Sequence, residues 1–260
     1  MRHPALKRLA VVWMAALAVS GCGLRPAHIP ETVTIQQAIE AIERWSPRIQ
    51  DYSGRASVLV DAGEGPQTAT LLIRYIYPGR FRVYVKGFAG IDLARITALG
   101  DSVAVYVPSE NLYVTAARGN DLLARLAPDA DIDLDGIEFI FDGSLPPPDE
   151  RIAQTITMDI REREADLTVS KGARAHRYTL AGPALRLVSE VLLVDGEPVV
   201  RKKFEKFGTY NGVVFPEELT LERGGTIVKI KFSQSIFNSG LTDRDLLFAV
   251  PPSAERVAVE

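Results

Sequence analysis

The feature that recurs along most of this 260-residue chain is an alternation of apolar and polar side chains with a period of two, which starts at Tyr52. Segments 55–60, 80–86 and 103–107 each place apolar residues at every second position, and turn residues such as Pro78-Gly79 separate one segment from the next. Such alternation is typical of antiparallel strands that bury one face and expose the other to water. The pattern predicts a meander of about eleven strands.

A helical period precedes the strands. Thr34 and Gln37 have the spacing of a capping box, in which each side chain bonds to the backbone of the other residue. The apolar residues that follow recur at helical spacing on one face: Ile35, Ala38, Ile39, Ile42 and Trp45. Because Pro47 disfavours helix in the residue before it, we expect one amphipathic helix that ends around Ser46.

The strand pattern is interrupted in the middle of the chain. Apolar residues cluster at 122–126 and again at 137–141, and a triple proline follows at 146–148. These clusters predict short helices that pack over the sheet. The expected fold is mainly β with α: a single strongly curved antiparallel sheet, an open β-barrel of about eleven strands, with a helical lid over its concave face.

The N-terminal segment has the anatomy of an export signal. Basic residues precede an apolar run over 9–19, and small residues then lead to Cys22, the one cysteine of the chain. The apolar run is shorter than the roughly 20 residues that a membrane-spanning helix needs. Ser20-Gly21-Cys22 resembles the bacterial lipobox, in which the cysteine receives acyl chains and becomes the new N-terminus. The alternative is a free or buried cysteine after an ordinary signal peptide.

On the lipobox interpretation the chain has three parts. We expect a cleaved signal peptide over 1–21, a flexible tether over 22–31 that carries lipidated Cys22, and a single folded domain over 32–260. Acyl chains, which contribute about 0.8 kcal/mol for each buried methylene, would hold the protein on a bacterial membrane. Gly23 stands where an aspartate commonly signals retention in the inner membrane, so an outer-membrane location facing the periplasm is favoured.

Charge and cysteine content exclude other classes of protein. The chain has 30 basic and 33 acidic residues, and removal of 1–21 takes three basic residues, which leaves 27 against 33 and a net charge of −6. No basic block for nucleic acid is present. Without Cys22 as a free thiol the mature protein forms no disulfide, although the periplasm permits them.

Residues that support catalysis or metal binding are sparse. His176 is the one histidine of the expected domain, and we expect it on the polar face of a strand. Acidic residues alternate over 129–135 as in a calcium loop, but its glycine and distal glutamate are missing, which favours a solvated linker. No nucleophile motif occurs. We therefore expect neither an enzyme, nor a metal site, nor a cofactor.

Several short motifs occur in an order that resembles the LolA/LolB family of lipoprotein carriers and receptors. They are Trp45, Tyr52-Ser53-Gly54-Arg55, Gly87-Phe88-Ala89-Gly90, Asp142-Gly143-Ser144-Leu145-Pro146 and the late hairpin over 216–232. The resemblance covers most of the mature chain and implies an open β-barrel with a helical lid. Two departures are the phenylalanine at a loop tip where LolB receptors present leucine, and a tail over 243–252 past the expected last strand.

The inner face of the predicted sheet is the candidate binding site. If the sheet curves too widely for its side chains to fill it, an apolar cavity for acyl chains remains. The candidate wall residues are Val58, Leu71, Ile73, Phe81, Val83, Val103, Val105, Leu219, Val228 and Ile230. The candidate lid residues are Ile39, Ile42, Leu123, Leu126, Ile137 and Ile140. The alternative for each of them is a filled hydrophobic core.

Phe88 is the candidate for contact outside that cavity. It stands with Ala89 between two glycines, in a tight connection between strands that offers little chance of burial. An exposed aromatic side chain in such a loop can insert into a membrane or touch cargo. The alternative is that Phe88 folds back onto the helices.

These observations favour an envelope lipoprotein that binds acyl chains or the lipid of lipoproteins, in lipoprotein localisation or lipid transfer at the outer membrane. The expected partners are the membrane, acyl chains and a soluble periplasmic carrier protein, with no nucleic acid, and a monomer is expected. The alternative is a structural or assembly lipoprotein of the envelope that uses the same fold for protein partners, without lipid cargo.

Overall fold

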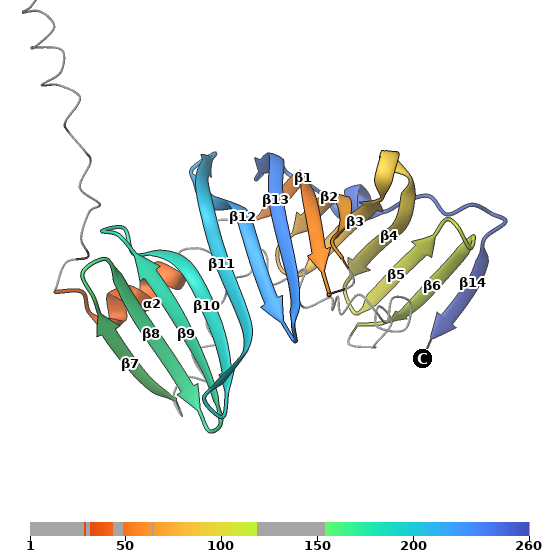
Figure 1. Ribbon diagram of the computed structural model, residues 1–260. Coiled ribbons are helices and arrows are strands. Elements are labelled where there is room, and N and C mark those ends of the chain that lie inside the picture. The colour runs from red at the N-terminus through yellow and green to blue at the C-terminus, as the bar shows by residue number, and fades with distance from the viewer. Residues whose placement is uncertain (1–28, 30–31, 44–48, 64, 119–153, 260) are drawn as a thin grey trace, which may run out of the picture.

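The computed structural model describes residues 29, 32–43, 49–63, 65–118 and 154–259. In this part of the chain the strands form one open, strongly curved sheet in the spatial order β14-β6-β5-β4-β3-β2-β1-β13-β12-β11-β10-β9-β8-β7 (Figure 1). A mainly β fold with a single curved sheet is confirmed. The expected number of strands is wrong, because the sheet has 14.

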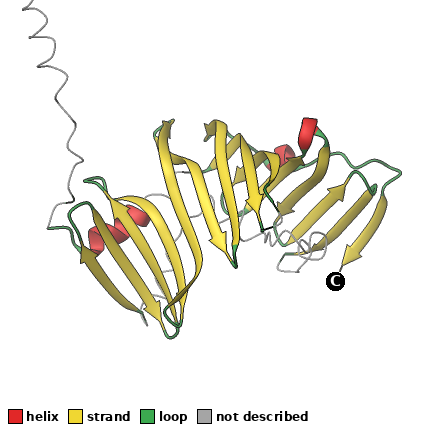
Figure 2. Cartoon of the chain, viewed as in Figure 1, coloured by secondary structure: helices red, strands yellow, loops and turns green. Residues whose placement is uncertain are grey.

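The elements have the following bounds. The first half of the sheet contains β1 (Asp51–Asp61), β2 (Gln67–Ile76), β3 (Arg80–Lys86), β4 (Asp92–Leu99), β5 (Ser102–Val107) and β6 (Leu112–Ala117). The second half contains β7 (Thr155–Ile160), β8 (Glu164–Lys171), β9 (Arg174–Ala181), β10 (Arg186–Val194), β11 (Glu197–Tyr210), β12 (Val213–Arg223) and β13 (Thr226–Phe237). The remaining elements of the described residues are β14 (Glu255–Val259), helix α2 (Ile35–Glu43) and the 3-10 turns η2 (Phe88–Gly90) and η4 (Asp243–Leu246) (Figure 2).

The sheet consists of two antiparallel meanders joined at one seam. Consecutive strands pair from β1 to β6 and again from β7 to β13. At the seam β1 pairs with β13, so that Val58 lies opposite Ile230. β14 departs from this order, because it lies parallel to β6 at the edge of the sheet.

Three strands, β4, β6 and β14, account for the difference between eleven and 14. The inner positions of β4 include the small residues Ala94 and Ala98, and β6 ends in Ala116-Ala117, so their hydrophobic alternation is weak. Strand β14 is short and exposed at four of its five positions. Alternation detects strands with large buried side chains and misses strands of this kind.

Helix α2 begins with the predicted capping box. The Thr34 backbone N donates to Gln37 Oε1 at 2.9 Å, and the Gln37 backbone N donates to Thr34 Oγ1 at 3.2 Å. Ala38, Ile39 and Ile42 are buried, and the helix lies beside β10 and β7 at one end of the sheet (Figure 1). Ile35 is exposed, contrary to the prediction, so the buried face of the helix begins one turn later at Ala38. Trp45 and Ser46 lie outside the described residues.

We call the face of the sheet that carries the buried apolar side chains the inner face. One row of opposed residues crosses the first meander: Ile73, Val83, Ile96, Val105 and Val114. A second row crosses the seam: Val58, Ile230, Leu219 and Phe204. All of these side chains are buried and belong to one apolar cluster. The seam is therefore packed continuously, and the two meanders share one core.

Aromatic rings fill the core at the seam. Tyr52 lies 5.0 Å from Phe237 and 5.9 Å from Phe215, measured between ring centroids. Burial raises the pKa of Tyr52 to about 12, although its hydroxyl group shares a hydrogen bond of 3.3 Å with Ser235 Oγ, which lowers it. A Cβ atom at residue 54 would collide with the Tyr52 hydroxyl group, so only glycine fits there.

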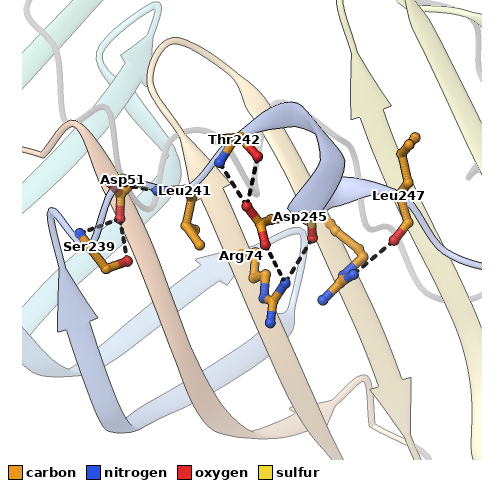
Figure 3. A network of polar contacts seen from close by, with 8 residues as sticks. Asp51, Arg74, Ser239, Leu241, Thr242, Asp245 and Leu247 are labelled. Carbon is orange, nitrogen blue, oxygen red and sulfur yellow. Dashed lines mark hydrogen bonds and ion pairs between the residues drawn. The ribbon is translucent and has the colours of Figure 1, made fainter.

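The opposite face, which we call the outer face, is crossed by the chain that follows β13. This segment, residues 238–254, is referred to as the strap (Figure 3). The first residues of the strap bind to Asp51 of β1, which is 4% exposed. The Asp51 carboxylate accepts hydrogen bonds from Ser239 N at 2.8 Å, Ser239 Oγ at 2.9 Å, Gly240 N at 2.8 Å and Leu241 N at 3.2 Å.

Those bonds determine the ionisation of Asp51. Burial alone would raise the pKa of this carboxyl group, but the backbone N–H groups of Ser239, Gly240 and Leu241 and the Ser239 hydroxyl group outweigh burial. The net result is a pKa below the ordinary value, because donated hydrogen bonds stabilise the charged form.

The strap then makes polar and aromatic contacts with β2, β3, β4 and β6. Arg74 Nη1 donates to Asp245 Oδ1 at 3.3 Å (Figure 3). The Thr97 hydroxyl group lies 3.0 Å from the Leu246 carbonyl oxygen, with Thr97 and Leu246 both buried. Phe248 lies between Tyr84 and Tyr113, with its ring centroid 6.3 and 6.4 Å from theirs. The tail beyond the expected last strand is therefore part of the fold.

Candidate functional site

The ten candidate wall residues all lie on the inner face. Eight of them are buried, and Leu71 and Val228 are half-buried and pack against the same cluster. They come from β1, β2, β3, β5, β12 and β13, and antiparallel pairing brings them side by side. The arrangement gives a continuous apolar surface across both meanders. Its use as the wall of an acyl-chain cavity stays a prediction.

The candidate lid is only partly described. Ile39 and Ile42 of α2 are buried in the inner-face cluster, and α2 lies beside β10 and β7. The other four lid candidates, Leu123, Leu126, Ile137 and Ile140, lie outside the described residues, as does Cys22. One α-helix is therefore established within the described part of the chain, and a lid over the whole inner face stays a prediction.

A buried polar cluster on the inner face was missed by the sequence analysis. Glu190 is 3% exposed, and its carboxylate lies 3.1 Å from His176 Nδ1 and accepts a bond from Lys202 Nζ at 3.3 Å. The prediction that His176 lies on the polar face is wrong, because His176 is two residues from the buried Tyr178 and stacks on its ring at 6.0 Å. The available signal was a glutamate inside the apolar run 187–194. The lysine and the histidine offset the cost of burying this carboxylate.

The turn between β3 and β4 and the start of β4 expose three large apolar side chains. Phe88 is 91% exposed, Ile91 63% and Leu93 47%. Backbone bonds close the turn, since Gly87 N donates to the Ile91 carbonyl oxygen at 2.8 Å and Gly90 N donates to the Gly87 carbonyl oxygen at 3.1 Å. The Phe88 side chain is therefore held away from the core, although its contact with a membrane or a cargo stays a prediction.

The outer face carries a hollow of about 810 Å³ beside this turn, which we call the outer groove. Residues of five strands form one row along its floor, each opposite the next: Glu218, Lys231, Ser57, Thr70 and Lys86. Arg55, Lys229, Thr68 and Thr220 extend the lining, and Phe88 borders it. No local sequence pattern predicts this groove, because its residues meet only through the register of strands that are distant in sequence.

Ion pairs set the charge of the outer groove. Glu218 accepts a bond from Lys206 Nζ at 2.7 Å, which lowers the pKa of Glu218 and raises that of Lys206. Glu205 Oε1 lies 2.9 Å from Lys203 Nζ. Lys86 donates to Asp92 Oδ1 at 2.6 Å, and this bond lowers the pKa of Asp92, as does a second bond from Arg95.

Among the residues that the structure describes, no group of three or more histidine, cysteine, aspartate or glutamate side chains is placed to hold a metal ion. The acidic segment 129–135 lies outside them. In the same described residues, no helix has both the length and the apolar character needed to span a bilayer.

No protein-family model and no curated protein matches the chain. Its fold is similar to that of a DUF1329 family protein from Desulfovibrio piger, with a TM-score of 0.60 and 13% identity over 83% of this chain and 98% of that one. It is also similar to a LolA superfamily protein from Nitrosomonas europaea, with a TM-score of 0.55 and 12% identity over 84% and 99% of the two chains.

A third similar structure is an outer membrane lipoprotein-sorting protein domain from Vibrio parahaemolyticus. Its TM-score is 0.56 and its identity 9%, over 81% of this chain and 94% of that one. At these identities the similarity concerns the fold. The open curved sheet of this protein is therefore a LolA/LolB-like fold.

Proposed function

We propose that this protein is a bacterial envelope lipoprotein that binds acyl chains, or the lipid part of lipoproteins, on its inner face. Acyl chains on Cys22 anchor it to the outer membrane, and its domain faces the periplasm. The observation that carries the proposal is the exposure of Phe88, Ile91 and Leu93. Three large apolar side chains exposed close together, in this turn and at the start of β4, are typical of a surface that contacts a membrane or another apolar partner.

The inner face and the turn have separate roles in this proposal. The apolar surface that includes Leu71, Ile73 and Ile230 holds the acyl chains, and the Phe88 turn contacts the membrane that receives them. A soluble periplasmic carrier delivers the cargo. The fold shared with a LolA superfamily protein and with a lipoprotein-sorting domain supports this assignment.

A second candidate function is a structural or assembly lipoprotein that binds protein partners and carries no lipid. The observation that favours it is the depth of burial of the inner face, where Ile73, Phe81 and Val83 are at most 2% exposed. Side chains packed this closely are what a filled core requires.

Lipid binding separates the two functions. A soluble form that begins at Glu31 is expected to carry lipid in native mass spectrometry and to bind a fluorescent fatty-acyl probe. Leu71→Glu places a charge on the inner face and should weaken probe binding, because an unpaired charge is costly in an apolar site. Leu72→Glu, one position along β2 and on the outer face, is the matched control.

The comparison of probe binding by the wild type and the two variants distinguishes the two functions. Weaker binding by folded Leu71→Glu, with binding by Leu72→Glu unchanged, supports the acyl-chain site. A folded wild-type protein that neither carries lipid nor binds the probe supports the structural lipoprotein. Near-ultraviolet circular dichroism establishes that each variant keeps its packed core.

A further inference from the structure

The outer groove has the volume of a ligand site and opens on the face opposite the acyl-chain surface proposed above. At about 810 Å³ it falls within the roughly 300–1,000 Å³ that is usual for small-molecule sites. It opens on the outer face, where Ser57, Thr70 and Lys231 lie in its floor, and the buried residues Val58, Leu219 and Ile230 contribute to the same lining. The strap covers the outer face next to it, at Arg74 and Arg82.

The charges of the groove favour an anionic ligand. Four cations line it, Arg55, Lys86, Lys229 and Lys231, against two carboxylates. Lys203 and Lys206, which stand outside the lining, pair with the two carboxylates, Glu205 and Glu218, at 2.9 and 2.7 Å. Two of the four cations are also paired, because Lys86 bonds to Asp92 at 2.6 Å and Lys231 lies 3.8 Å from Glu218. Within the described part of the chain, Arg55 and Lys229 have no ion-pair partner, and both are exposed. A local positive site on a chain with a net charge of −3 is a specific feature of this face.

Hydroxyl groups lie between those cations. Ser57 is opposite Thr70 and Lys231, while Thr68 and Thr220 line the same hollow. Hydroxyl donors combined with arginine and lysine are the usual partners of phosphate oxygens. The chemistry of the floor therefore fits a phosphate group better than an uncharged or apolar ligand.

The border of the groove is apolar, which indicates a ligand whose phosphate is attached to an apolar group. Phe88 lines the groove and is 91% exposed. A cationic, hydroxyl-lined hollow with an exposed aromatic side chain at its border matches a molecule with a charged head and an apolar tail, as at the surface of a membrane.

We propose that the outer groove binds the phosphate headgroup of an anionic membrane lipid, so that the outer face at β12, β13, β1 and β2 docks on the membrane with Phe88 inserted beside the headgroup. The proposal rests on the envelope location proposed above and does not depend on whether the inner face carries acyl cargo. It assigns to Arg55 and Lys229 the role of headgroup-binding residues.

The test uses the full-length acylated protein in vesicles of phosphatidylcholine, with and without phosphatidylglycerol. A fluorophore on Ala89→Cys reports insertion of the turn through quenching by lipids that carry bromine on their acyl chains. Because acylation blocks the thiol of Cys22, residue 89 provides the single reactive thiol. We expect strong quenching only in vesicles that contain phosphatidylglycerol.

The combined substitution Arg55→Gln and Lys229→Gln should lower the ratio of docked to undocked protein by about fivefold for each charge removed, or roughly 25-fold. The matched control is Lys171→Gln with Arg174→Gln, which removes the same charge at the exposed β8–β9 turn and should leave docking unchanged. Arg55→Lys with Lys229→Arg keeps both charges and should retain docking.

Three results would overturn the proposal. They are equal quenching in both kinds of vesicle, unchanged docking of the folded glutamine variant, and binding of inorganic phosphate by a wild-type protein that does not dock on phosphatidylglycerol vesicles, which would indicate a site for free phosphate. Flotation with phosphatidylcholine vesicles reports the acyl anchor separately. If the protein does not float there, Cys22→Ser keeps the single thiol, and docking is measured as flotation with phosphatidylglycerol vesicles.

Discussion

At the scale of single residues, Asp51 determines where the strap leaves the sheet. Its carboxylate receives four donated hydrogen bonds from Ser239, Gly240 and Leu241 while almost fully buried. The same residue accepts a backbone bond from Asn238 N at 2.9 Å, so both its side chain and its main chain hold the start of the strap. One negative charge therefore ties the first strand to the end of the last strand of the second meander.

This ionisation makes the stability of the protein dependent on pH. The pKa of Asp51 is lowered in the folded state, so its stabilising effect is complete above the ordinary aspartate pKa of about 4 and is lost as the pH falls through the lower folded value. Asp51→Asn should lower the free energy of unfolding by roughly 1–3 kcal/mol at pH 7 and by less at pH 3. Urea unfolding at the two pH values measures this difference, with the exposed Asp101→Asn as control.

Phe88 supports a prediction of the opposite kind, a change in function without a change in stability. Phe88→Glu should alter the free energy of unfolding by less than about 0.5 kcal/mol, because the side chain is 91% exposed. It should reduce transfer of acylated cargo from a soluble carrier to liposomes. Ile236→Glu, a substitution at another exposed apolar residue, should leave transfer unchanged. Equal transfer by wild type and Phe88→Glu would show that the turn has no part in delivery.

Some residues of the candidate site could be predicted from the sequence and others could not. The position of Phe88 in a connection between strands could be recognised because two glycines flank it within one short segment. The outer groove could not, because Arg55 and Lys229 line one hollow only when β1 and β13 pair in a particular register. His176 was misplaced because its own polarity was given more weight than its distance of two residues from Tyr178.

At the scale of elements, predictability followed the strength of the local pattern. β3 and β13 have large apolar side chains at alternate positions, and α2 has a capping box, so all three were predicted. β14 was not, since its place beside β6 depends on a strap that has no hydrophobic period. The strap is held by contacts with residues of β1, β2, β3, β4 and β6, and no local pattern within 238–254 contains that information.

The strap should nevertheless contribute strongly to stability. Leu246 is fully buried, whereas its neighbour Leu247 is 57% exposed. Leu246→Ala should lower the free energy of unfolding by about 2–4 kcal/mol, the usual cost of deleting a buried leucine side chain. Leu247→Ala should change it by less than about 0.5 kcal/mol. Chemical denaturation of both variants measures the difference, and similar values for the two would mean that the strap is only loosely packed.

At the scale of the whole molecule, the proposed function first requires that the protein be anchored at the outer membrane. Cys22→Ser removes the thiol that would receive the acyl chains. We expect this variant to lose metabolic labelling by a palmitate analogue and to be missing from the outer-membrane fraction, with its folded domain unaffected. Ser20→Ala, which keeps a small residue before the cysteine, should be labelled like the wild type. Labelling of Cys22→Ser at the wild-type level would contradict lipidation at this residue.

The seam between β1 and β13 also has a consequence for the order in which the protein folds. Each meander is built from hairpins between consecutive strands, and such local contacts form quickly. β1 is synthesised early, and its partner β13 is synthesised only after the eleven strands between them. We therefore expect the shared core to close only after β13 has been synthesised. A chain that stops before β13 would expose two unfinished half-cores, and proteases would remove it.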